Sequence, residues 1–152
     1  MTIDPQLKLL LDEQAIRNLI VSAWAALDSK DWPTYAEAFA SDGVFEIMGQ
    51  RREGRDVIVA GPARDLAKYD ALQHIVSNEL IRVDGDMAEG QWYAIAVHVP
   101  SAADASEHAD VGLHYRFRAR READGWRFTE VALEPKWTAG MRFGIDELPD
   151  DA

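Results

Sequence analysis

The hydrophobic pattern of this chain changes its period once along the sequence, and that change restricts the possible folds. From about Pro5 to Lys30, apolar residues recur every three or four positions, which predicts a long amphipathic helix. From Ala71 onward, apolar and polar residues alternate, which is typical of strands with one buried face. Helices first and strands afterwards indicate an α+β protein whose amino-terminal helices cover one face of a sheet.

Shorter elements are expected between these two parts. "SKDWPTYAEAFA" predicts a second helix, with Asp31 as its cap and Pro33 in its first turn, where a missing N–H group costs little. "GVFEI" predicts a short strand. "GRDVIVAGPARDLAKY" predicts one or two short helices, interrupted at Gly61 and Pro62.

The alternating part divides into four runs, at residues 71–83, 87–99, 109–120 and 125–133. The turns "DGD" and "ADG" and the longer loop "PSAADASEHA" separate these runs, so together they predict an antiparallel meander. The apolar parity of the last run changes near Thr129, which predicts a bulge there. Because bulges bend sheets, we expect a curved sheet with a concave face.

The length and composition are those of a single globular domain. A chain of 152 residues with 47% hydrophobic content can bury one core, so we expect one domain over residues 1–152, with its core at about 8–140 and a tail at 141–152. Acidic residues number 27 against 16 lysines and arginines, and the net charge of −11 argues against a nucleic-acid partner.

Two absences in the sequence narrow the possible chemistry and location. The chain has no cysteine, which excludes disulfides, thiolate zinc sites and cysteine nucleophiles. No run approaches the roughly 18 apolar residues that span a bilayer, and the amino end "MTIDPQLKLLLDEQ" has no cleavage-site pattern. We therefore expect a cytoplasmic protein without a membrane partner.

The first alternating run, "ALQHIVSNELIRV", carries a histidine where the pattern requires an aliphatic residue. Strand geometry places His74 on one face with Leu72, Val76, Asn78 and Leu80. Two interpretations are open. Either His74 is a core residue with a local hydrogen-bond partner, or its face lines a cavity in which a ligand binds and reacts.

Four stretches, "WAALDSKDWPTYAEAFASDGVFEI", "GRDVI", "QHIVSNELI" and "GWRFTEVALEPKW", together resemble the SnoaL-like family of the nuclear transport factor two-like superfamily. The resemblance covers roughly residues 8–140. It implies a cone in which a curved antiparallel sheet wraps round the helices and leaves an interior pocket at the open end. It does not determine the activity, because this superfamily holds cyclases, dehydratases, isomerases, a dehydrochlorinase, dioxygenase small subunits and binding modules.

The resemblance also implies a catalytic pair. In family dehydratases and the dehydrochlorinase, an aspartate near the end of the first helix orients a histidine on the second strand, and Asp28 and His74 occupy the matching places. A neutral imidazole can remove a proton at physiological pH, while a carboxylate at its other nitrogen fixes the tautomer. Several family enzymes carry a tyrosine or lysine that assists the leaving group where this chain has Ala23 and Trp24. That acid is missing unless Tyr115 or a substrate group supplies it.

Large apolar side chains are the candidates for a substrate-binding wall, although each taken singly is also explained as plain core. These candidates are Trp24, Phe45, Met48, Trp92, Tyr115 and Trp137. His98, His108 and His114 do not form a convincing set of three converging ligands, so we expect no bound metal. No cofactor is expected either.

These inferences favour a cofactor-independent lyase or isomerase that acts on a small hydrophobic, cyclic molecule, with His74 as general base and Asp28 as its orienting group. Two alternatives remain. One is a non-catalytic module of the same fold that binds a ligand or a partner. The other is a small subunit of a ring-hydroxylating dioxygenase.

Two further expectations concern the assembly and the carboxyl end. The outer face of a sheet with helices on one side needs polar residues or a second subunit, so we expect a homo-oligomer, most simply a dimer, with a trimer as the other arrangement. Pro135 is expected to end the last strand, because proline cannot donate to the ladder. Residues 137–145 carry spaced apolar anchors and are expected to fold back as a lid.

Overall fold

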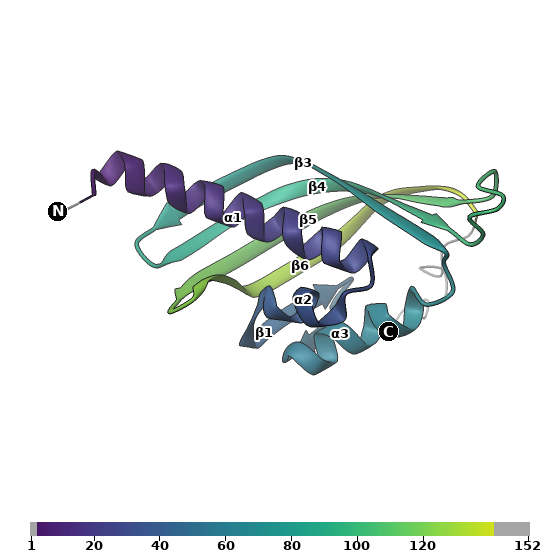
Figure 1. Cartoon of the computed structure of the whole chain (residues 1–152), viewed down its shortest axis with the longest axis horizontal. Helices are drawn as coiled ribbons and strands as arrows, with labels where there is room; N and C mark the ends of the chain where they lie inside the picture. The colour runs from purple at the N-terminus through teal and green to yellow at the C-terminus, as the bar shows by residue number, and fades with distance from the viewer. Residues whose placement is uncertain (1–2, 142–152) are drawn as a thin grey trace.

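The fold combines three helices with one six-stranded sheet, in a computed structural model that describes residues 3–141. The helices are α1 (Pro5–Asp28), α2 (Trp32–Glu37) and α3 (Arg55–Asp65), and the strands are β1 (Phe39–Ile47), β2 (Gln50–Glu53), β3 (Ala71–Asp84), β4 (Met87–Val99), β5 (Ala109–Glu122) and β6 (Gly125–Gly140). In Figure 1, α1 runs across one face of the meander formed by β3 to β6. The elements α2, α3 and β1 lie beside the carboxyl-terminal end of α1. Within residues 3–141, no helix combines the length and the apolar character needed to cross a bilayer.

The long helix α1 is confirmed, and its start follows from local chemistry. The side chain of Asp4 accepts hydrogen bonds from the backbone N–H groups of Gln6 and Leu7, and Pro5 occupies the first turn. Its buried face includes Ile16 and Ile20, which have no exposed surface. The helix therefore packs on the sheet through its second half.

The sheet has the order β2-β1-β6-β5-β4-β3 and is not closed. The antiparallel meander of β3, β4, β5 and β6 is confirmed. β1 lies parallel to β6, with Ile47 opposite Leu133, so the sheet is mixed rather than purely antiparallel. The expected α+β class with amino-terminal helices against a curved sheet is confirmed.

Two bulges shape β6. The first leaves Thr129 without a partner between the pairs Arg118–Glu130 and Ala119–Phe128, which confirms the predicted bulge. The second falls between the pairs of β5 with Pro135 and with Trp137, and the strand continues to Gly140. The prediction that Pro135 ends the strand is therefore wrong. Proline is tolerated there because it adjoins a register shift and lies beyond the last residue paired with β1.

A third bulge divides β3. The register shifts between Ser77 and Leu80, and Asn78 adopts a left-handed conformation with φ of 56°, which asparagine accepts more readily than most residues. Asn78 is exposed, and Leu80 is 63% exposed. The expected common face of β3 therefore ends at Val76, and Asn78 and Leu80 do not share it with His74.

Two other predicted segments differ from the structure. Gly61 and Pro62 do not interrupt α3, which continues through both and ends at Asp65. Residues 137–140 of the expected lid belong to β6 instead. The rest of that lid, which includes Phe143 and Ile145, lies outside the described residues.

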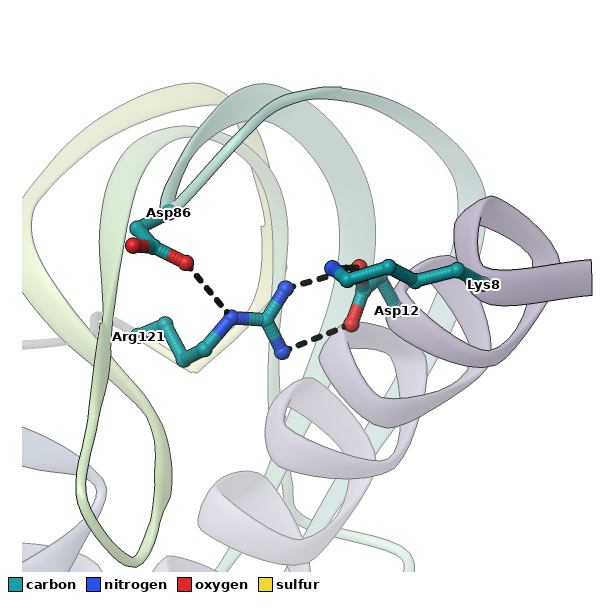
Figure 2. Close-up of polar contacts among 4 residues, drawn as sticks. All are labelled: Lys8, Asp12, Asp86 and Arg121. Atoms are coloured by element: carbon teal, nitrogen blue, oxygen red, sulfur yellow. Dashed lines mark hydrogen bonds and ion pairs between the residues drawn. The ribbon is translucent and has the colours of Figure 1, made fainter. Parts of the chain in front are cut away.

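A hydrogen-bonded charge cluster ties the first half of α1 to the sheet (Figure 2). The Arg121 guanidinium donates to both carboxylate oxygens of Asp12, at 2.8 and 2.7 Å, and to Asp86 at 2.9 Å, while Lys8 donates to Asp12 at 2.8 Å. The hydrogen bonds from Arg121 hold the pKa of Asp12 well below its usual range, although burial acts in the opposite direction. A bidentate arginine–carboxylate pair fixes orientation as well as distance.

Candidate active site

Asp28, the last residue of α1, holds His74 of β3 by two hydrogen bonds. The Nδ1 atom of His74 lies 2.6 Å from Asp28 Oδ1, and the backbone N–H of the same histidine donates to Oδ2 at 2.7 Å. The side chain of His74 is only 6% exposed and that of Asp28 is 21% exposed. A carboxylate at Nδ1 favours the tautomer with its proton on that nitrogen, which leaves Nε2 as a proton acceptor.

The chain reversal after α1 positions this pair. Lys30 has φ of 58°, and its backbone N–H donates to Leu27, as expected of a left-handed residue that ends a helix. Its ammonium donates to the backbone carbonyl of Tyr69 at 2.7 Å. Because Tyr69 lies just before β3, this bond holds the end of α1 close to the strand that carries His74.

His74 lies at the wall of an interior cavity of about 380 Å³. Four of the predicted wall residues line it, namely Trp24, Phe45, Met48 and Tyr115. The cavity is bounded by α1 and α2, by the meander, and by β1, β2 and α3. This size and the mainly apolar lining suit a small organic ligand.

The other two predicted wall residues lie elsewhere. Trp92 does not line the cavity, because it is fully buried behind Tyr115, stacked at 4.7 Å between ring centroids. Trp137 pairs with Gly112 on the outer face of the sheet, where its indole occupies the space that a Cβ of residue 112 would need. The bulge before Trp137 gives it this orientation, and 47% of its surface is exposed.

Tyr115, the residue expected to replace the missing acid, lines the cavity. Its hydroxyl accepts a hydrogen bond from the indole Nε1 of Trp24 at 3.1 Å. Burial raises the pKa of Tyr115 well above its ordinary value, so the hydroxyl keeps its proton. Because the indole uses only a lone pair of the oxygen, the proton of Tyr115 stays available as a donor.

A second histidine of the site escaped the sequence reasoning, which considered it only as a metal ligand. His98 on β4 is 3% exposed, lines the cavity, and lies 6.1 Å from His74 between ring centroids. Its Nδ1 contacts the backbone carbonyl of Ala109 at 3.3 Å. Burial, and then the nearby His74, lower the pKa of His98 to about 4, so it is neutral at neutral pH. A register counted from the "DGD" turn alone would place His98 opposite Gln73, on the outer parity of β3. The bulge at Asn78 shifts His98 to a place opposite Leu72 and diagonal to His74, so no local signal in the sequence identified it.

Two polar residues of the cavity were also missed: Tyr35 of α2 and Arg52 of β2. Tyr35 is 2% exposed, and burial raises its pKa well above the ordinary value. Arg52 faces inward because it pairs with Phe45, another wall residue, across the β1–β2 hairpin. Within residues 3–141, no group of three or more carboxylate, histidine or cysteine side chains is arranged to hold a metal ion.

By its fold and its site, this chain is an α+β protein with an apolar cavity between helices and a curved sheet and an Asp–His pair at the cavity wall. The profile of the SnoaL-like domain matches residues 8–132, which is most of the chain. The chain therefore belongs to the SnoaL-like domain family, as the resemblance implied. No curated protein matches it by sequence.

Solved structures share this fold at low sequence identity. A Novosphingobium aromaticivorans protein provisionally named scytalone dehydratase has a TM-score of 0.79 at 18% identity, over 88% of this chain and 89% of that one. A hexachlorocyclohexane dehydrochlorinase (LinA) of type 2 has a TM-score of 0.76 at 16% identity, over 90% and 93%. An N. aromaticivorans protein provisionally named aromatic ring hydroxylase has a TM-score of 0.76 at 23% identity, over 87% and 94%. These similarities support the fold.

Proposed function

We propose that the protein is a cofactor-independent lyase or isomerase that removes a proton from a small hydrophobic, cyclic substrate. The observation that carries this proposal is the 2.6 Å contact between Asp28 and the Nδ1 atom of His74 at the wall of the cavity. Two structural neighbours carry the names of a dehydratase and a dehydrochlorinase, which belong to the same class of reaction. Membership of the SnoaL-like family agrees with it.

In this mechanism the Nε2 atom of His74 accepts a proton from a carbon atom of the substrate. The carboxylate of Asp28 stabilises the imidazolium that forms and prevents the ring from rotating, because it also holds the backbone N–H of the same residue. The electron pair of the broken C–H bond then either expels a leaving group or moves within the ring system. Tyr115 can donate a hydrogen bond to the developing negative charge while keeping its proton, since its oxygen accepts from Trp24 and its own hydrogen is left to donate.

A ligand-binding module without turnover is the second candidate. The observation that favours it is Ala23, which stands near the position where several family enzymes carry an acid and is 1% exposed. A methyl group there assists no leaving group. Under this candidate the cavity binds the same small apolar molecules, but the Asp–His pair serves only to recognise them.

The test is proton exchange on simple cyclic ketones. We would incubate the protein in D₂O with 2-tetralone, 1-indanone or cyclohexanone and follow loss of the α-proton signals by NMR. Acceleration by the wild type that is abolished in His74→Asn is the expected result. His114→Asn is the matched control, because His114 lies on the outer face of the sheet and bonds to Gln91. Acceleration that survives His74→Asn, or none with all three ketones, contradicts the proposal.

A further inference from the structure

The cavity contains a cation that the proposed proton transfer does not use. Arg52 lines the cavity from β2 and is half-buried there. The two nearby arginines have partners. Arg51 donates to Glu53 at 2.6 Å, and Arg55 donates to the backbone carbonyl of Phe39 at 2.7 Å. Within residues 3–141, Arg52 has neither a hydrogen bond nor an ion pair. An unpaired guanidinium at a mainly apolar wall is unusual, because removing a charge from water is unfavourable unless a counter-charge approaches it.

Gly61 of α3 leaves space for the guanidinium of Arg52. Gly61 is buried in the interior of α3, where glycine is among the least favourable residues. A Cβ atom at Gly61 would overlap the guanidinium and lie 2.6 Å from Arg52 Cζ. The head group of Arg52 therefore rests directly on the backbone of α3, and the absence of a side chain at residue 61 allows it.

A second donor lies close by. Tyr35 lines the same cavity and is buried, and the charge of Arg52 acts on its hydroxyl. Within the described part of the chain, that hydroxyl makes no hydrogen bond. Lys68 also lines the cavity, and its ammonium lies over the ring of Tyr69 rather than beside a carboxylate. Arg64 and Asp65 also line the cavity and bond to each other, so Arg52 and Lys68 leave this wall with a net positive charge in a chain whose net charge is −11.

We propose that Arg52 and Tyr35 form a carboxylate-binding subsite, so that the ligand of the cavity is a small cyclic carboxylic acid. The guanidinium presents two parallel N–H groups that match the two oxygens of a carboxylate, and the tyrosine hydroxyl donates a further hydrogen bond. The apolar ring of the ligand then packs against Trp24 and Tyr115, toward His74. This inference specifies the substrate class of the proposed function and rests on it for turnover, whereas binding can be measured without turnover.

The experiment compares one acid with its neutral counterpart. Calorimetry with 2-naphthoate and 2-naphthamide measures the preference for a carboxylate on the same apolar body. We expect the wild type to bind 2-naphthoate at least about tenfold more tightly, the size of effect that a hydrogen bond to a charged group supplies. Arg52→Met should abolish the preference. Gly61→Ala should reduce it, because the new methyl group displaces the guanidinium without removing its charge. Arg51→Met is the matched control and should keep the preference.

Several outcomes overturn the inference. These are equal affinity of the wild type for both probes, binding of neither probe, and a preference that persists in Arg52→Met. If Arg52→Met does not fold, Gly61→Ala decides the question, because an unchanged preference in that folded variant also overturns it. His74→Asn separates this inference from the proposed function. A carboxylate preference without His74-dependent proton exchange refutes only the proposed enzymatic function. Proton exchange without the carboxylate preference refutes only the proposed subsite.

Discussion

The carboxylate of Asp28 joins the imidazole and the backbone of one residue, His74, at 2.6 and 2.7 Å. This arrangement requires two acceptor oxygens. An amide in the same place can accept only one of the two hydrogen bonds, and its NH₂ group must face either the ring nitrogen or the backbone N–H. Replacing the Asp28 carboxylate by an amide of the same shape is therefore enough to break one of its two hydrogen bonds to His74.

Asp28→Asn should consequently lower both activity and stability. If the amide donates to Nδ1, the imidazole keeps its proton on Nε2 and can no longer act as a base. We expect a loss of about 100-fold or more in exchange rate, in the range of general-base effects, and about 1 to 3 kcal/mol in the free energy of unfolding. NMR exchange rates and urea denaturation measure the two quantities. A variant with normal activity would show that Asp28 does not orient the base.

Stability should depend on pH through His98. Its pKa falls from 6.5 to about 4 on folding, chiefly because of burial. The unfolded chain therefore binds more protons between these values, so the free energy of unfolding decreases as the pH falls from about 6.5 to 4 and is restored above 6.5. The full effect is about 3 kcal/mol for a shift of this size.

Urea denaturation of the wild type and His98→Gln at several pH values from 4 to 7 tests this dependence. The variant should lose most of the slope, while His108→Gln, a change at the half-buried end of the loop before β5, should keep it. Equal slopes in the wild type and His98→Gln would mean that other groups cause the acid sensitivity.

The Arg121–Asp12 pair should support stability without affecting the site. Arg121→Met leaves the Asp12 carboxylate, which is 7% exposed, with only the bond from Lys8. We expect a loss of about 2 kcal/mol, below the usual value for a buried pair because the arginine side chain is 29% exposed. Asp12 precedes Asp28 by 16 residues of one helix, or roughly 24 Å, so exchange rates should not change. Arg82→Met, which breaks the exposed pair with Glu89, should leave the free energy of unfolding within error. An equal loss in both variants would contradict this account.

The outer face of the sheet is the expected oligomer interface. Ile75 lies opposite Ile95, Ile95 lies opposite Gly112, and Trp137 covers Gly112, which together form an apolar row across β3 to β6. The exposed fractions of Ile75, Ile95 and Trp137 are 50%, 42% and 47%. We expect light scattering to give the mass of a dimer or trimer, and the double change Ile75→Glu with Ile95→Glu to give a folded monomer. A monomeric wild type at micromolar concentration would exclude this interface.

Local periodicity was sufficient to predict α1 and the meander, because each is specified within a short window. The parallel pairing of β1 with β6 was not predictable in this way. Ile47 and Leu133 are far apart in sequence, and nothing local to either strand specifies the other as its partner. The bulge at Asn78 was missed for a different reason, since a single left-handed residue leaves the alternation on either side of it intact.

The site was predictable to a similar degree. Asp28 and His74 were identified through the family resemblance, and their contact follows from it. His98 and Arg52 were missed because their significance depends on neighbours from other elements. Arg52 in particular reads as one of several surface arginines in "GQRREGR" until α3 is placed beside it. Trp137 was misplaced because the second bulge of β6 reverses its direction.

The left-handed residue at Asn78 has a consequence for how the protein can vary. It divides the β3–β4 hairpin into a half that carries His74 and a half that ends at the tip near Gly85. A register change in the distal half can be absorbed at this irregular position, because its pairing is already interrupted there. A substitution or insertion near the tip can therefore change the pairing of the distal half without turning the histidine away from the cavity.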